Sequence, residues 1–409
     1  DAKKDGGAGS AGIRRGLRTR RGLVVTEIAL ALVLLTGAGL FFRSLLALAR
    51  VDPGFQTEQM VMVPLHLGSN YEAAQRIQFT RDVAARLATM PGTEAVAAGL
   101  TAPFQHVGAS RCCIWHEVRA AGGVEGADPL PDVMTQPVSA DYFRTIGAPL
   151  SFGREFDVSD EEGDGRIVII NEPLARHFFR TEDAVGESLE VGGWGTFTVV
   201  GVARGVRHWG VSQGIPPAVY VPYGQWGAFA DSYTLMVRST ADSETLSSLI
   251  REAVWAFDPG LPVEEIVSVR QQAETEMAGQ RFLSILLGTF ATIALLLATG
   301  GIYATMLQTV GQRRQEMGIR MALGATGSQV VGLILKGGLA LTLTGMLFGI
   351  LASVGLTQVL RAWLFGIGFV DFWTLAMVVA VLSSGALLAS LIPALKAARA
   401  DPVDTLKVE

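Results

Sequence analysis

Four separated hydrophobic stretches constrain the fold of this chain more than any other feature of its sequence. They occupy residues 22–42, 282–307, 329–360 and 373–395. An α-helix rises about 1.5 Å per residue, so roughly 20 apolar residues cross the ~30 Å of hydrocarbon in a bilayer. Each stretch is long enough, and we therefore predict a membrane protein with four transmembrane α-helices.

The composition agrees with this class and gives no sign of catalysis. Hydrophobic residues make up 49% of the chain and charged residues only 17%, both shifted from soluble averages toward membrane proteins. The sequence contains no GxxxxGK[ST] phosphate-binding loop, no GxSxG and no HExxH. These motifs carry ATP binding, serine hydrolysis and zinc proteolysis. We therefore expect no enzyme activity and no cofactor bound by this chain itself.

Charge assigns an orientation to the helices. Five arginines precede the first stretch, three more lie between the second and third, and three basic residues follow the fourth. Because Lys and Arg are enriched in cytoplasmic segments, both termini are expected inside and the block after the first stretch outside. The predicted plan is a basic cytoplasmic segment 1–21, helix 22–47, an extracytoplasmic domain 48–280, helix 281–308, a cytoplasmic loop 309–328, helix 329–360, an outside loop 361–372, helix 373–395 and a cytoplasmic tail 396–409.

A cleaved signal peptide is the alternative for the first stretch. The basic flank and the small residues at 47–49 fit a cleavage site. However, the apolar core of about 21 residues is longer than the 7–15 residues of a signal sequence. The sequence therefore favours a retained transmembrane helix.

Two ionisable residues fall within the hydrophobic stretches. Glu27 lies near the cytoplasmic end of the first and Lys336 about two turns into the third. Glu27 either extends toward the headgroups, or pairs with a boundary arginine, or serves as an intramembrane coupling charge, whereas Lys336 either extends toward the headgroups or makes a contact in the bundle interior. No stretch has several ionisable groups near its middle, which argues against an ion-coupled secondary transporter.

Small residues indicate close helix packing. Gly345 and Gly349 form a GxxxG motif in the third stretch, and Ser353 continues the same face, whereas Gly300 and Gly301 interrupt the second stretch. Without a hydrophobic driving force between helices in lipid, small residues let helix backbones approach. We expect the third stretch to pack against a neighbour through this face.

The outside block has mixed α and β patterns. Alternating or β-branched runs predict strands, and apolar residues at helical spacing predict helices at 71–90, at 242–257 with Asp242 or Ser243 as the cap, and from Asn171 through Phe179. The intermixing favours an α+β domain of two subdomains with a linker in 119–132. The predicted strands lie within 60–67, 166–171, 196–206, 218–222 and 233–237.

Two polar clusters in this block are weak site candidates. Cys112 and Cys113, with His106 and His116 nearby, are poorly spaced for one tetrahedral metal site. The acidic run 157–164 lacks the glycine and the final glutamate of an EF-hand loop, so we interpret it as a solvated loop. We therefore predict no metal site.

Motifs at both ends of the membrane region resemble a known family. The run QRRQEMGIRMALGAT (312–326) after the second stretch and ADPVDTLKVE (400–409) after the fourth are similar to the permease domain of FtsX- and MacB-type ABC transporters. The outside block resembles that family's periplasmic core domain in VDPGF, MPGTEAVA, VSADYFRTIGAPL, VIINEPLARHFF and FDPGLPVEEI. The resemblance covers nearly the whole chain in order. It is closest to one half of the duplicated orphan permeases of acidobacterial type, preceded here by a linker-like DAKKDGGAGSAG.

The resemblance implies a coupling segment. In this family two permease halves meet in the membrane, and a separate ATPase dimer binds the loop between the second and third helices. Carried onto this sequence, the segment comprises Arg313, Arg314, Gln315, Glu316, Gly318, Arg320, Leu323, Gly324 and Ala325. Gln315, Glu316 and Arg320 would face the ATPase, while Met317, Ile319, Met321 and Leu323 would pack on the spans. The alternative is a basic cytoplasmic loop without a partner.

The resemblance further implies a multi-pass protein of the bacterial inner membrane. Its expected role is export or efflux by mechanotransmission, in which ATP bound by a separate subunit changes the conformation of the outside domain. Expected partners are an ABC ATPase, a second permease half or a second copy, membrane lipid and a periplasmic protein, but no nucleic acid. The alternatives are a membrane-anchored sensor or binding module without an ATPase, and a channel or secondary transporter.

Overall fold

The computed structural model separates the chain into two compact units. It describes residues 6–105, 114–121, 128–163, 165–226, 232–263, 266–313, 316, 319–320, 326–360 and 371–398. The first unit, here called the helical unit, combines residues 1–50 with 278–409. The second, here called the sheet unit, comprises residues 51–277.

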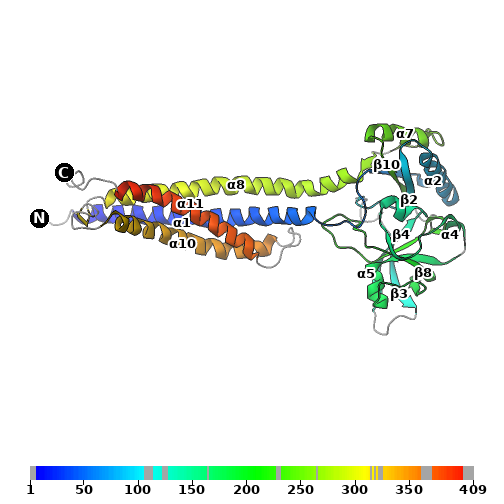
Figure 1. Ribbon diagram of the computed structural model, residues 1–409, viewed down its shortest axis with the longest axis horizontal. Coiled ribbons are helices and arrows are strands. Elements are labelled where there is room, and N and C mark those ends of the chain that lie inside the picture. Colours follow the sequence, from blue (N-terminus) through cyan, green and yellow to red (C-terminus); the bar gives the residue numbers. More distant parts are fainter. Residues whose placement is uncertain are drawn as a thin grey trace. The chain divides into compact units, whose positions relative to one another are not determined.

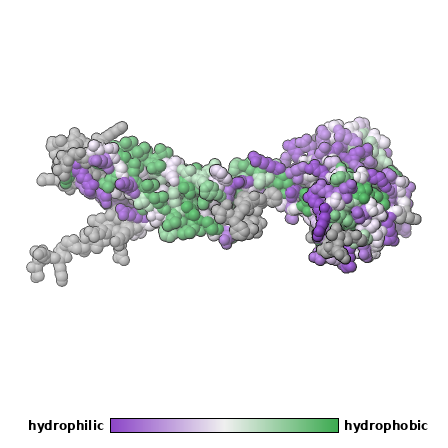
Figure 2. Space-filling model, turned by 60° about the horizontal axis from the view of Figure 1, so that its bottom comes forward, coloured by the Kyte–Doolittle hydropathy of each residue, from purple (hydrophilic) through white to green (hydrophobic). Residues whose placement is uncertain are grey.

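Four long helices cross the helical unit (Figure 1). They are α1 (Gly6–Ala49), α8 (Val269–Gln312), α10 (Gly327–Leu360) and α11 (Phe372–Ala398). Each contains a window apolar and long enough to span a bilayer, and hydrophobic surface covers these helices on the face shown in Figure 2. The prediction of four transmembrane helices is therefore confirmed. The 44 residues of α8 correspond to about 66 Å, so α8 extends well beyond the hydrocarbon.

The interior of the helical unit is built from small and branched side chains. Val24, Ile28 and Leu32 of α1 are buried against Ala294 and Ala298 of α8 and against residues of α10 and α11. The close helix contacts of this unit are those of α1 with α10, α10 with α11 and α1 with α11, and α8 adds small side chains such as Ala294 and Ala298 to the shared cluster.

The sheet unit is an α+β fold around one continuous sheet. Its strands are β1 (Met60–His66), β2 (Thr93–Gly99), β3 (Ile114–Ala121), β4 (Leu130–Val138), β5 (Leu150–Gly153), β6 (Ile167–Asn171), β7 (Ser188–Val191), β8 (Gly195–Ala203), β9 (Ala218–Pro222), β10 (Ser232–Ser239) and β11 (Val267–Ser268). The sheet order is β11-β1-β10-β2-β4-β3-β7-β8-β6-β9, and β5 pairs with β8. The helices are α2 (Ala73–Ala88), α3 (Tyr142–Ile146), α4 (Val158–Glu162), α5 (Glu172–Phe179), α6 (Tyr223–Trp226) and α7 (Ser243–Trp255), with a 3₁₀ turn η1 (Gly68–Asn70).

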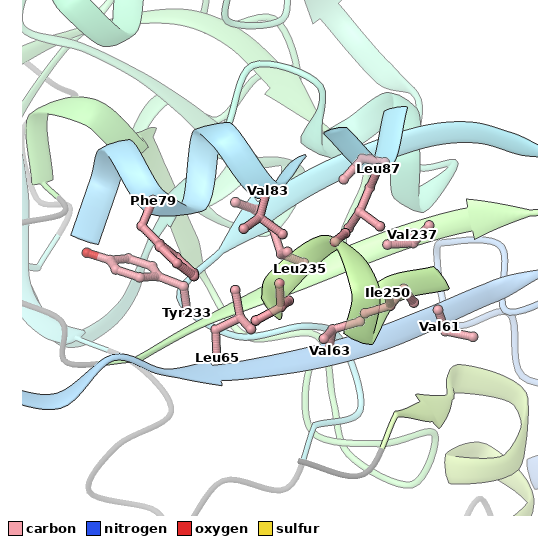
Figure 3. Close-up of a cluster of buried hydrophobic side chains, with 14 of the residues drawn as sticks. Val61, Val63, Leu65, Phe79, Val83, Leu87, Tyr233, Leu235, Val237 and Ile250 are labelled. Atoms are coloured by element: carbon pink, nitrogen blue, oxygen red, sulfur yellow. The ribbon is translucent and has the colours of Figure 1, made fainter. Parts of the chain in front are cut away.

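One hydrophobic core lies between the first four strands of this order and two helices. Inward residues alternate along β1 and β10, as in Val61, Val63 and Leu65, and helices α2 and α7 pack on them (Figure 3). Val83 of α2 and Ile250 of α7 are fully buried there. The apolar residues that alternate along the strands pack against the apolar residues at helical spacing in α2. This shared core is why the sequence pattern predicted both elements.

A second core lies within the other strands. Strand β4 pairs in parallel with β9 as well as antiparallel with β3, so β4-β3-β7-β8-β6-β9 forms a closed ring. Its buried residues include Val133, Ile170 and Val219, and Phe178 of α5 packs with them. The two cores are joined in the sheet by a single β2–β4 residue pair, Gly99 with Val138.

Helix caps lie where the sequence predicted them. The Asp242 carboxylate accepts a hydrogen bond of 2.9 Å from the Thr245 N–H at the start of α7. The Asn171 side chain accepts one of 3.2 Å from the Leu174 N–H at the start of α5. Each cap satisfies a backbone donor that the helix itself leaves free.

Two interpretations of the sheet unit were wrong. Residues 119–121 and 130–132 belong to β3 and β4, which pair as a hairpin, so 119–132 is not a linker between subdomains. The acidic run 157–164 is not a solvated loop, because Asp157 caps α4. Within α4, the Glu161 carboxylate is buried, accepts from the Ala140 N–H at 2.9 Å and pairs with Arg81 at 3.0 Å.

Candidate coupling site and helix contacts

The described part of the coupling segment presents a charged helical face. Glu316, Ile319 and Arg320 are helical, and the Arg320 guanidinium donates to the Glu316 carboxylate at 2.7 Å. Residues four apart lie on one face of a helix. Both side chains are about half exposed, so their remaining hydrogen-bonding groups are available to a partner.

Ile319 differs from its expected role. It was expected to pack on the spans, but 47% of it is exposed. The reason is helical geometry, since Ile319 lies three positions after Glu316 and is therefore its neighbour on the helix surface. Arg313 is described at the end of α8. The other predicted coupling residues lie outside the described residues: Arg314, Gln315, Gly318, Leu323, Gly324 and Ala325, with Met317 and Met321.

The residues after this segment start the next helix. The Gln329 side chain accepts a hydrogen bond of 3.1 Å from the Thr326 N–H, just before α10. This is the backward half of a capping box. The structure therefore assigns these positions to helix initiation.

A cavity of about 420 Å³ lies near the coupling segment, between α1, α8 and α10. The cavity is lined by Arg21 of α1, by Arg313 just after α8 and by Gly337 of α10. Close by, the Arg20 guanidinium donates to the Gln308 side chain and links α1 to α8. The arginines that predicted a cytoplasmic end are therefore gathered at one end of the helical unit.

The GxxxG residues lie against α1. A Cβ added at Gly345 would be 2.7 Å from the Ile28 Cβ, and one added at Gly349 would be 2.9 Å from the Leu32 Cβ and 3.1 Å from the Ala29 carbonyl oxygen. Contacts under about 3 Å cannot persist between these atoms. Only glycine permits this separation between α1 and α10.

Ser353 continues the same α1–α10 contact. It is buried, and its hydroxyl lies 3.5 Å from the Thr36 hydroxyl of α1. The three small residues of the predicted face therefore meet the same helix.

Glu27 lies at the contact of α1 with α8. Its Oε2 is buried and has no hydrogen-bond partner within the described residues, so the expected pairing with a boundary arginine is not seen there. A Cβ added at Gly301 would be 2.4 Å from this oxygen. The helix α8 continues through Gly300 and Gly301, so these glycines do not interrupt it, and Gly301 instead leaves room for the Glu27 side chain.

The remaining candidates lie apart from this contact. Lys336 is exposed on α10. His116 of β3 lies 3.1 Å from the Thr135 hydroxyl, and burial lowers the pKa of its imidazole. His106, Cys112 and Cys113 lie outside the described residues.

Sequence reasoning missed one ion pair in the helical unit. The Arg43 guanidinium of α1 donates to the carboxylate of Asp371, the residue before α11. Asp371 also accepts from the Thr374 hydroxyl in the first turn of α11. A lone acidic residue before a hydrophobic stretch and an arginine late in another could have suggested this pair.

Comparison with known proteins agrees with the four-helix layout and the inserted α+β domain. The profile of the MacB-like periplasmic core domain matches residues 23–253, more than half of the chain, and that of the FtsX-like permease C-terminal region matches residues 288–402. The chain belongs to the FtsX/MacB-type family of ABC transporter permeases. The family expected from the sequence is confirmed.

Curated relatives of this FtsX/MacB-type permease carry matching names. It is 29% identical over 287 residues to the uncharacterized ABC transporter permease YvrN of Bacillus subtilis, covering 66% of this chain and 69% of YvrN. It is 30% identical over 293 residues to the macrolide export ATP-binding/permease protein MacB of Shigella sonnei, covering 66% of this chain. The chain spans only 43% of the length of that MacB.

Solved structures give a weaker likeness. The periplasmic region of MacB from Actinobacillus actinomycetemcomitans aligns with 56% of this chain and 97% of its own length, at 14% identity and a TM-score of 0.38. The extracellular domain of YknZ aligns with 50% of this chain at 17% identity and a TM-score of 0.35.

Proposed function

We propose that this FtsX/MacB-type permease couples ATP hydrolysis by a separate ABC ATPase to a conformational change of its sheet unit outside the cell membrane. The observation that carries the proposal is the half-exposed helical face of Glu316, Ile319 and Arg320 between α8 and α10. An exposed apolar residue beside a charged pair suits a protein interface, where polar groups lie around apolar ones.

The proposed orientation places this face in the cytoplasm of a bacterial inner membrane. Arg20, Arg21 and Arg313 lie at the same end of the helical unit, which supports that side by the positive-inside rule. The sheet unit would then be outside. ATP would be bound by the partner, because this sequence has no phosphate-binding loop.

A side-specific labelling experiment tests the orientation. Both Ser212 in the sheet unit and Ser328 at the start of α10 are exposed. In a variant with Cys112 and Cys113 replaced by serine, a membrane-impermeant maleimide should label Ser212→Cys in intact cells. It should label Ser328→Cys only after permeabilisation. Labelling of Ser328→Cys in intact cells would reverse the proposed orientation.

A second permease half is the proposed partner in the membrane. Apolar side chains at helical spacing on α8, including Phe290, Ile293 and Leu297, are exposed in the single chain. Such a face suits either lipid or another apolar helix. An export or efflux role is proposed from the names of the relatives, and a periplasmic protein is the proposed outside partner.

The coupling proposal predicts the effect of one charge reversal. Glu316→Lys should abolish co-purification of an ABC ATPase from the same genome, because it places repulsive charge in an interface where removing one partner of a buried charge pair already costs about 2–5 kcal/mol. Loss of the exposed Glu316–Arg320 pair alone would cost only a few tenths of a kcal/mol of stability. Membrane insertion should therefore be normal.

A matched control separates docking from helix stability. Arg270 and Glu274 of α8 form another exposed pair four residues apart, at 3.1 Å. Glu274→Lys should leave ATPase binding unchanged. The double swap Glu316→Arg with Arg320→Glu restores the internal pair but should not restore binding. Normal binding by Glu316→Lys, in an assay where the wild type binds, would remove this face from the coupling role.

A further inference from the structure

A groove of about 840 Å³ opens between α1, α8 and α11 in the helical unit. It lies at the end where α1 finishes at Ala49 and α11 starts at Phe372. Helix α8 contributes only the small side chains of Ser284, Gly288 and Ala291 to its wall. Because these residues carry so little bulk, α8 leaves a hollow beside the other two helices. The volume is in the range of sites that hold small organic molecules.

The walls of the groove are apolar up to the arginine end. Leu35, Phe42 and Leu46 line it from α1, and Met377 and Val381 line it from α11. The rise from Leu35 to Phe42, before Arg43 enters the lining, is about 10 Å, roughly a third of the ~30 Å hydrocarbon core. Met377 is 71% exposed despite its position in the wall. An acyl chain lying along the groove would cover this surface.

Two arginines lie at one end of this apolar wall. Arg43 pairs with Asp371, whose side chain is only 7% exposed, whereas the Arg43 side chain itself is 50% exposed. A guanidinium has five N–H donors, so Arg43 can bind a second anion beside Asp371. Arg50 is exposed and has no side-chain partner within the described residues. Among the residues that line the groove and their described partners, these two arginines face one carboxylate, that of Asp371, which leaves the lining at this end positive.

An exposed tryptophan lies at the same end. Trp373 lines the groove at the start of α11 and is 74% exposed. Tryptophan is enriched at the level of lipid headgroups, where its ring contacts hydrocarbon and its N–H contacts polar groups. It therefore places Arg43 and Arg50 close to the headgroup region.

We propose that this groove binds an anionic phospholipid, with an acyl chain along α1, α8 and α11 and the phosphate at Arg43 and Arg50. A second permease copy would offer an apolar helix to the groove but no anion to the two arginines. A zwitterionic lipid would bring a compensating cation. The charge at the arginine end therefore selects an anionic lipid. The assignment of the lipid to the outer leaflet rests on the orientation proposed above.

Photo-crosslinking tests the site with the full chain in nanodiscs. The probe is a photoactivatable phosphatidylglycerol diluted into phosphatidylcholine, and labelled peptides are located by mass spectrometry. The wild type should be labelled in α1, α8 and α11 around the groove. Arg50→Gln should need about five-fold more probe for equal labelling, because one arginine near a membrane surface contributes about 1 kcal/mol to anionic lipid binding. Arg281→Gln, which removes an exposed arginine of α8 outside the groove, should change nothing.

A second variant fills the groove without removing charge. A Cβ added at Gly288 meets no atom within 4 Å, so Gly288→Leu should fold normally and abolish labelling. Gly300 is equally open on α8 and does not line the groove. Gly300→Leu should therefore keep wild-type labelling.

Three outcomes would overturn the proposal. One is equal labelling by a photoactivatable phosphatidylcholine, which would make the groove a general hydrocarbon contact. Another is unchanged labelling of Gly288→Leu. The third is disulfide formation between Met377→Cys residues of two copies without lipid labelling, which would assign the groove to a second chain. The measurement needs no ATPase, so its failure would leave the coupling proposal standing, and failure of ATPase binding would leave the lipid site standing.

Discussion

At the scale of single residues, the polar groups that lack partners are the most informative. His208 of the sheet unit is buried, and its Nε2 lies 3.2 Å from the Tyr220 hydroxyl. Its Nδ1 is buried with no hydrogen-bond partner within the described residues. Burial opposes the charged imidazolium and lowers the pKa of His208 from 6.5 to about 4.

This pKa predicts a loss of stability in mild acid. Between pH 6.5 and 4 the unfolded chain binds a proton at His208 that the folded sheet unit does not bind. Stability due to the neutral histidine is therefore present above pH 6.5 and is lost as pH falls toward 4. At pH 5 the stability lost relative to pH 7.5 amounts to about 2 kcal/mol. Urea unfolding followed by tryptophan fluorescence should show a smaller decrease from pH 7.5 to 5 for His208→Gln than for the wild type.

The control for this prediction is an exposed histidine. His177 of α5 is exposed, so His177→Gln should retain the wild-type dependence on pH. If His208→Gln and the wild type lose the same stability between pH 7.5 and 5, His208 is not the group responsible.

Residues in the family-like motifs proved to be turn and contact residues. Gly54 of VDPGF has a φ of +83°, and a Cβ there would be 2.1 Å from the Gly205 carbonyl oxygen. Glycine alone both adopts this positive φ without strain and leaves room for the carbonyl oxygen. The sequence pointed to this motif through resemblance, but the carbonyl that excludes a side chain comes from a loop about 150 residues away in the chain. Local patterns hold no information on such a contact.

At the scale of elements, the GxxxG contact makes a direct prediction. A side chain at Gly349 would meet the Ala29 backbone of α1, which cannot rotate away as a side-chain end could. Gly349→Leu should therefore separate α1 from α10 and lower stability by about 1–3 kcal/mol, the usual cost of overpacking. Thermal unfolding of the purified protein in detergent measures this loss.

Gly355 provides the same substitution at an open position of α10, since an added Cβ meets no atom within 4 Å. Gly355→Leu should keep the wild-type melting temperature, as should Leu351→Ile on an exposed side chain. Equal melting temperatures for Gly349→Leu and Gly355→Leu would place Gly349 on a lipid-facing surface.

Elements with a strong local signal could be predicted, and elements defined by distant partners could not. The cap at Asp242 and the alternating apolar residues of β10 depend only on residues close together in the sequence, and both are present in the structure. Strands β2, β3, β4, β5, β7 and β11 were not predicted, because their places depend on pairing with other strands of the sheet. The acidic run was misread because the partner of Glu161 is Arg81, 80 residues earlier.

The candidate site shows the same limit. The sequence suggested a close contact at Gly345 and Gly349, but not that α1 is the helix they meet. It suggested the Glu316–Arg320 face from helical spacing, yet that spacing was not applied to Ile319, which shares the face. The pair of Arg43 with Asp371 joins segments from opposite ends of the chain, and spacing alone does not reveal such a pair.

At the scale of the whole molecule, the proposed function requires an ATPase on one side of the membrane to alter the domain on the other. Within the sheet unit, the two hydrophobic cores are joined in the sheet by the single pair of Gly99 with Val138. At this β2–β4 junction, few backbone hydrogen bonds must break for the two halves of the sheet to change their angle. Regions with few such bonds open at low free energy, which makes this junction the expected place of change.

Hydrogen exchange of the full chain in nanodiscs, with its ATPase bound, tests this account most directly. Mass spectrometry would compare peptides that contain β2 and the end of β4 without nucleotide and with ATP and vanadate. We predict that nucleotide changes the exchange of these peptides in the wild type and in Glu274→Lys, but not in Glu316→Lys. Identical exchange throughout the wild-type sheet unit, with the ATPase bound and occupied by nucleotide, would contradict coupling between the ATPase and this domain.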